Sequence, residues 1–126
     1  MFNSDQIIIY EDKNGQISVD VVLRDEMVWL NLTQLSELFL RDKSVISRHI
    51  KNILKEEELS AVSTVANFAT VQQEGGHEVQ REIEYYNLDA IISVGYRVNS
   101  IRGTQFRQWA SRILRDYFVQ GYSLHQ

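Results

Sequence analysis

The stretch "LTQLSELFLRDKSVISRHIKNILK", Leu32–Lys55, contains two helical patterns separated by a short polar turn. The apolar residues of the first pattern recur three and four positions apart, the period of an α-helix: Leu32, Leu35, Leu38 and Phe39. Asn31 or Thr33 can cap the start of this helix. In the second pattern one half of the helical wheel holds Val45, Ile46, His49, Ile50, Ile53 and Leu54, and the opposite direction holds Arg48, Lys51 and Lys55. Each helix therefore has an apolar face, and the two faces can cover one another.

The connection between these helices, Arg41–Lys43, is short enough to predict a steep crossing, which is the geometry of a helix-turn-helix. The residue order "LSELFLRDKSVISRHI", Leu35–Ile50, resembles the signature of that motif. The motif usually has glycine in its turn, because the chain there adopts a left-handed conformation. Leu40 stands in this turn, which leaves open that the turn is built differently.

The second helix of a helix-turn-helix places its N-terminal part in the major groove of DNA. Candidates there for base edges or phosphates are Lys43, Ser44, Ser47 and Arg48. Arg41 and Lys51 are better placed for backbone phosphates, and Lys55 extends the basic face. We therefore predict duplex DNA as a partner. The alternative is that an amphipathic helix merely turns its charges toward water.

The net charge of −4 by itself disfavours a nucleic-acid partner, but the basic residues are unevenly distributed along the chain. Ten of the thirteen basic residues lie in two windows, Arg41–Lys55 and Arg97–Arg115, in which Asp42 is the only acid. The second window supplies further candidates for DNA contact: Arg97, Arg102, Arg107, Arg112 and Arg115. If the two windows lie on opposite faces of the fold, the solvated-helix alternative is favoured.

The remaining chain predicts an α+β fold of small antiparallel hairpins and a long C-terminal helix. Three strands are expected within 1–30, a helix-turn-helix-like pair within 32–57, a second hairpin within 60–86 around the turn "EGG", and helices within 88–122. Asn87 can cap the first of the later helices. The segment Asn99–Gly103 is expected to break it before a last helix from Gln105 to about Tyr122, with Gly103 serving the turn or, with Arg97 and Arg102, an anion site.

The composition is that of one soluble globular domain spanning 1–126. There is no cysteine and no apolar run of membrane-spanning length, so we expect a cytoplasmic protein.

The sequence offers only generic candidates for catalysis, and we predict no enzyme, cofactor or metal site. Glu78, Glu82 and Glu84 would share one strand face, where solvation is the ordinary explanation. Tyr85 and Tyr86 are remote candidates for a nucleophile, packing being the ordinary role of such residues. None of the histidines, His49, His77 and His125, has partners at metal-ligand spacing.

Two blocks, "VISRHIKNIL" and "YYNLDAIISVGYRVNSIRGTQFRQWASRIL" at Tyr85–Leu114, resemble the RhuM family of bacterial virulence-associated proteins. Members of that family are usually longer, so the chain is similar to their N-terminal domain. The resemblance implies a setting in mobile elements and pathogenicity islands and carries no catalytic residues. A weaker similarity links Phe106 and Trp109 to the "Phe-x-x-Trp" helix of Bro-N and KilA-N DNA-binding domains.

We therefore expect a DNA-binding domain of a RhuM-like protein. The alternative is a non-enzymatic interaction or oligomerisation module, in which a homodimer forms through the C-terminal helix and its aromatic residues Tyr117, Phe118 and Tyr122.

Overall fold

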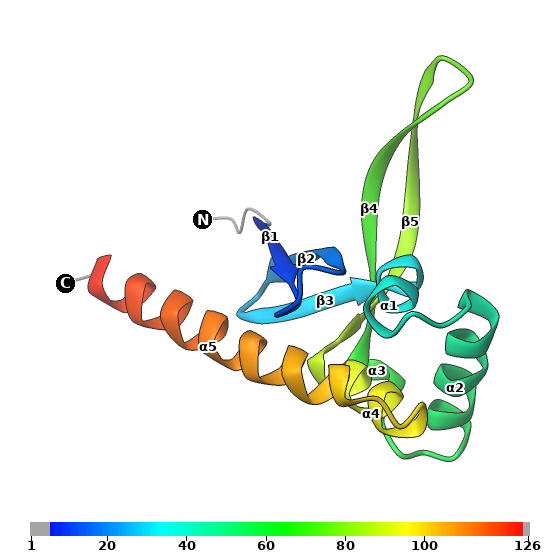
Figure 1. Ribbon diagram of the computed structural model, residues 1–126. Helices are drawn as coiled ribbons and strands as arrows, with labels where there is room; N and C mark the ends of the chain where they lie inside the picture. The colour runs from blue at the N-terminus through cyan, green and yellow to red at the C-terminus, as the bar shows by residue number, and fades with distance from the viewer. Residues whose placement is uncertain (1–5, 125–126) are drawn as a thin grey trace.

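A computed structural model describes residues 6–124, and the described strands form one antiparallel sheet of five (Figure 1). The spatial order is β1-β2-β3-β5-β4, so β1 and β4 are the edges. The strands are β1 (Gln6–Glu11), β2 (Ser18–Arg24), β3 (Met27–Asn31), β4 (Val65–Glu74) and β5 (His77–Asn87). The predicted α+β class, with hairpins and a long last helix, is confirmed.

The helices of the described chain pack on one face of this sheet and share its main core. They are α1 (Leu32–Phe39), α2 (Lys43–Lys55), α3 (Ala61–Thr64), α4 (Leu88–Arg97) and α5 (Ile101–Leu124). Strand β2 shows why the helices lie on that face, because Val19, Val21 and Leu23 alternate along it and are all buried among them. Each such side chain contributes about 1.5–3 kcal/mol through the water it excludes.

The other face of the sheet carries a smaller apolar cluster, to which no helix within residues 6–124 contributes. Val22, Phe68 and Tyr85 are buried there, with Trp29 packed against them. The guanidinium of Arg24 lies 3.9 Å from the centre of the Phe68 ring, a distance at which a cation is attracted to the ring face. This cluster anchors the base of the β4–β5 hairpin.

Asparagine side chains start two of the helices as the sequence predicts. Asn31 accepts a hydrogen bond from the backbone N–H of Gln34, whose side chain accepts one from the N–H of Asn31, so α1 begins with a capping box. Asn87 caps α4 by accepting from the N–H of Ala90 and also donates to the carbonyl of Ser63.

Helix α5 begins at Ile101, not at Gln105, so the predicted start and the turn role of Gly103 are wrong. The break is shorter than expected, with Asn99 in the left-handed region at φ 53°. Gly103 lies in the first turns of α5, where it packs against Gly95 of α4 beneath the ring of Phe39. A Cβ added to Gly95 would lie 3.1 Å from both neighbours. Close packing of the two helices thus overrides the poor helix propensity of glycine.

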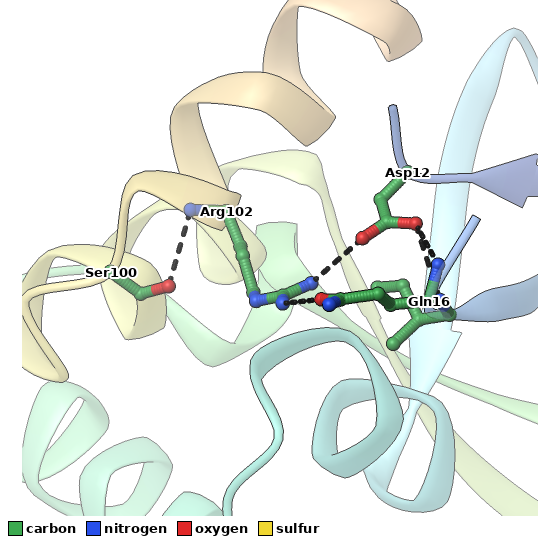
Figure 2. A network of polar contacts seen from close by, with 5 residues as sticks. Asp12, Gln16, Ser100 and Arg102 are labelled. Carbon is green, nitrogen blue, oxygen red and sulfur yellow. Dashed lines mark hydrogen bonds and ion pairs between the residues drawn. The ribbon is translucent and has the colours of Figure 1, made fainter. Parts of the chain in front are cut away.

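A partly buried ion pair holds the β1–β2 turn against the start of α5 (Figure 2). One carboxylate oxygen of Asp12 accepts hydrogen bonds from the N–H groups of Gln16 and Ile17, at 2.7 and 3.2 Å. The other oxygen accepts one from Arg102 at 3.4 Å. Burial alone would raise the pKa of Asp12, but the two N–H donors and Arg102 outweigh it and hold that pKa below its ordinary value.

The turn between α1 and α2 has the left-handed conformation for which glycine is usual. Leu40 ends α1 with φ 53° and ψ 48°, and its N–H donates to the carbonyl of Ser36. The hydroxyl of Ser36 donates in turn to the carbonyl of Arg41, at 2.6 Å. The turn is therefore not built differently for lack of glycine, because Leu40 itself adopts the left-handed conformation.

Leu40→Gly is expected to raise the free energy of unfolding by about 1 kcal/mol, because it relieves the left-handed strain of a side chain with a Cβ. Little packing is lost, since the Leu40 side chain is 56% exposed. Urea denaturation measures the change. Leu40→Ala keeps a Cβ at this position and is the matched control, so it should not raise the free energy of unfolding. An equal increase in that free energy would show that the leucine side chain, and not the backbone conformation, destabilises the turn.

Asp12→Asn is expected to destabilise the fold near neutral pH and to have little effect in acid. A carboxyl whose pKa is lowered by folding stabilises the protein above its unfolded pKa, and this stability is lost as the pH falls through the folded value. Urea midpoints of the two proteins should therefore converge as the pH is lowered below the ordinary aspartate pKa of about 3.9. Asp20→Asn, which alters an exposed carboxylate on β2, is the control. Parallel midpoint curves for Asp12→Asn and the unsubstituted chain would contradict this role.

Candidate nucleic-acid interface

Helix α2 is held in place by its apolar side, and its basic side faces solvent. Ile46, Ile50 and Ile53 are buried in the main core, where the helix contacts α1 and α4. The predicted cations on the opposite side, Arg48, Lys51 and Lys55, are all exposed, and so is Lys43 in the first turn. The amphipathic pattern thus has the orientation that a binding helix requires.

These four cations form no ion pair within the part of the chain that the structure describes. Arg81, Arg97 and Arg102, by contrast, each bind at least one carboxylate. The positive charge of α2 is therefore presented to solvent, as is that of Arg107, Arg112 and Arg115 on α5.

The first turn of α2 is built around Asp42. Its carboxylate accepts hydrogen bonds from the N–H and the hydroxyl of Ser44, and these bonds lower the pKa of Asp42. Ser44 is exposed but serves this cap, and Ser47 is half-buried. Because a carboxylate occupies the helix N-terminus, an anion is disfavoured at that end. Any phosphate contact falls to the cations further along the helix.

Arg41 lies in the turn before α2 and reaches the end of α4. Its guanidinium donates a hydrogen bond to the carbonyl of Val98, at 3.4 Å. The side chain is exposed, so this bond orients it without burying it.

Arg97 binds two of the three glutamates that follow α2. Its guanidinium binds the carboxylates of Glu56 and Glu58 at 2.6 and 2.8 Å, which lowers the pKa of Glu58. The sequence predicted Arg97 as a DNA contact, but the pairing of residues 41 and 39 positions apart could not be read from local spacing. The two negative charges beside the basic face are thereby partly offset, by one positive charge.

The second basic window does not join the surface of α2. Arg102 is engaged with Asp12, and Arg107, Arg112 and Arg115 are exposed on α5. Figure 1 shows α5 running away from α2, toward the opposite end of the molecule. The two basic windows therefore lie on separate parts of the fold, which favours the alternative of a solvated helix. A DNA interface would have to be formed by α2 alone.

His49 borders the apolar side of α2 and is half-buried. Burial lowers its pKa, and the nearby charges of Arg48 and Arg97 lower it further. The ring is therefore neutral at physiological pH and adds no charge to the basic face.

The hairpin that the sequence predicts around "EGG" is present, but the sequence did not reveal that it projects from the body. Strand β5 pairs with β3 only at Tyr85, Tyr86 and Asn87, so its outer part, with β4, forms a two-stranded arm that points away from the body (Figure 1). Glu78, Glu82 and Glu84 share one face of this arm, as expected from their spacing, and all are exposed. An acidic face of this kind is unsuited to DNA.

The described residues offer little to a catalytic interpretation. Tyr86 is buried in a central strand and donates a hydrogen bond to Glu84; burial first, and then this carboxylate, raise the pKa of its hydroxyl. A polar hollow lies between β2 and α1, lined by Ser18, Asp20, Asn31, Thr33, Gln34 and Glu37. Residues 6–124 contain no group of three or more side chains placed to hold a metal ion.

Helices long and apolar enough to cross a membrane are lacking in the described chain.

Searches of curated proteins and of solved structures gave no match. The similarity to Bro-N and KilA-N domains stays a prediction. A model of the virulence protein RhuM family matches residues 63–126, which include the block Tyr85–Leu114 and the elements from β4 to α5. This match covers half of the chain, and the protein therefore belongs to the RhuM family of virulence proteins.

Proposed function

We propose that this chain is a DNA-binding domain of a RhuM-family protein and that it binds duplex DNA through the basic face of α2. The observation that carries the proposal is the row of exposed cations Arg48, Lys51 and Lys55, which form no ion pair with a carboxylate of the described chain. Positive charge left unpaired in an acidic protein is suited to an anionic partner.

The geometry of α2 suits the phosphate backbone. With a rise of about 1.5 Å per residue, Arg48 and Lys55 stand about 10 Å apart along the helix axis, so their side chains can reach different phosphates. The packed α1–α2 pair holds these side chains on a rigid element. Base contacts from Ser47 and Arg48 would be made only after phosphates have positioned the helix.

The charges around α2 support the same function. Glu56 and Glu58 stand at its C-terminal end, where carboxylates would repel DNA, and both are bound by Arg97. The function of Arg97 in this proposal is electrostatic: it removes repulsion and makes no DNA contact itself. The exposed glutamates of the arm keep that part of the molecule away from the duplex.

A protein interaction or oligomerisation module is the alternative function. The observation that favours it is α5, whose C-terminal turns extend past the sheet (Figure 1). Tyr117 on this part is 39% exposed, whereas the side chains of Phe118 and Tyr122 lie outside the described residues. An exposed aromatic on an overhanging helix suits contact with another protein.

Arg48→Ala with Lys51→Ala is expected to weaken binding to duplex DNA and to flatten its salt dependence. Each lost phosphate contact lowers the slope of log K against log salt by about 0.9, so the double variant should lose about two units. Fluorescence anisotropy with random duplex DNA between about 0.05 M and 0.2 M salt measures the slope.

Arg107→Ala with Arg112→Ala is the matched control, because it removes the same charge from exposed positions on α5. It should leave the slope unchanged. Absence of binding at low salt, or an equal loss with the α5 variant, would count against α2 as the interface.

Arg97→Gln is expected to lower DNA affinity while leaving the salt slope unchanged, because it exposes DNA to Glu56 and Glu58 without removing a phosphate contact. The same anisotropy titration measures both quantities. Glu56→Gln with Glu58→Gln added to Arg97→Gln should restore the affinity. A slope reduced by about one unit would instead place Arg97 on the DNA.

A further inference from the structure

Strand β1 is an unprotected edge of the sheet. The segment Gln6–Tyr10 contains no charged residue, no proline and no glycine, although such residues commonly protect exposed edges. Ile7 and Ile9 are each 59% exposed on the face of the sheet that carries no helix. An apolar outer strand of this kind is suited to pairing with another strand.

The backbone of β1 also points the required groups outward. The N–H of Asp12 donates to the carbonyl of Ile17, so the even-numbered residues direct their N–H and C=O groups toward β2. The odd-numbered residues Ile7, Ile9 and Glu11 therefore direct theirs away from the sheet. These are the same residues whose side chains lie on the helix-free face.

We propose that two copies of this chain pair β1 with β1 in antiparallel fashion about a two-fold axis, which joins their sheets into one. The axis passes between the Ile8 residues of the two copies, so Ile7 of each copy lies opposite Ile9 of the other. This register joins the outward-pointing backbone groups of both strands, keeps the helices of both copies on the same side and brings no two charges together between Gln6 and Tyr10. A shift by one residue would place helix-side and helix-free side chains opposite one another.

Helix α5 enlarges this interface. Phe106 and Trp109 pack against Tyr10 of β1, with ring centroids 5.2 and 5.1 Å away, and they belong to the first half of the helix. The residues from 111 to 124 add about 21 Å at 1.5 Å per residue, and Figure 1 shows them passing beyond β1. A second copy at this edge would lie beside them.

The size of the interface explains why α5 matters. A pair of six-residue strands alone falls short of the roughly 1,200–2,000 Å² that stable interfaces bury, and the overhanging helix supplies further surface. The occupant that fits is a second copy, because the strand is complementary to itself in hydrogen bonding and apolar contact, and Gln6–Tyr10 carries no charge.

Charge substitution at Ile7 and Ile9 tests the pairing. The chain should sediment as a dimer at micromolar concentration. Ile7→Lys with Ile9→Lys should raise the dimer dissociation constant at least tenfold, because like charges would then lie directly opposite, and Ile7→Glu with Ile9→Glu should do the same. An equimolar mixture of the two double variants should regain the dimer, since lysine then lies opposite glutamate.

Val71→Lys is the matched control, as Val71 is 64% exposed on the other edge strand, β4. It should leave the dimer intact. A monomeric parent chain, an intact dimer in either double variant, or a mixture that stays monomeric would each overturn the proposal. Sedimentation reports self-association without DNA, so its outcome is separate from that of the anisotropy titration.

Discussion

The close crossing of α4 and α5 is the constraint on which the rest of the structure depends. Gly95 and Gly103 let the two helix backbones meet, and the ring of Phe39 from α1 closes over the contact. Two consecutive helices, α4 and α5, are thereby fixed relative to α1, which lies far from them in sequence. Because α2 packs against α1 and α4, its orientation follows from this crossing. Substitution of Gly95 would disturb the basic helix without touching it.

Electrostatic balance explains how an acidic chain can present a basic surface. Arginines distant in sequence are used to neutralise carboxylates at element ends, as Arg97 does for Glu56 and Glu58, and as Arg102 does for Asp12. Three further exposed glutamates, Glu78, Glu82 and Glu84, lie on the projecting arm. What remains unpaired on α2 is therefore a local excess of positive charge, although the chain as a whole carries a net charge of −4.

Periodicity and capping chemistry were enough to predict most elements, because they depend on neighbours in sequence. The α1–α2 pair, the Asn31 and Asn87 caps and the turn at Gly75 and Gly76 are of this kind. Long-range packing decided the rest: Gly103 is helical only because Gly95 lies against it, and Arg97 and Arg102 are engaged by partners far along the chain. The candidate site could be predicted where exposed helix positions define it, as at Arg48 and Lys51, but not where a charge has a distant partner.

The projecting arm has a consequence for local stability. Beyond Ile83 its two strands hydrogen-bond only to one another, since β3 reaches only the last residues of β5, from Tyr85 to Asn87. A two-stranded ribbon without a third strand is marginally stable in water, and the anchoring cluster of Phe68 and Tyr85 lies at its base. The ribbon can therefore open and close while the main core stays folded. Its backbone amides should exchange with solvent through these local openings, whereas those of the buried strand β3 exchange through unfolding of the whole domain.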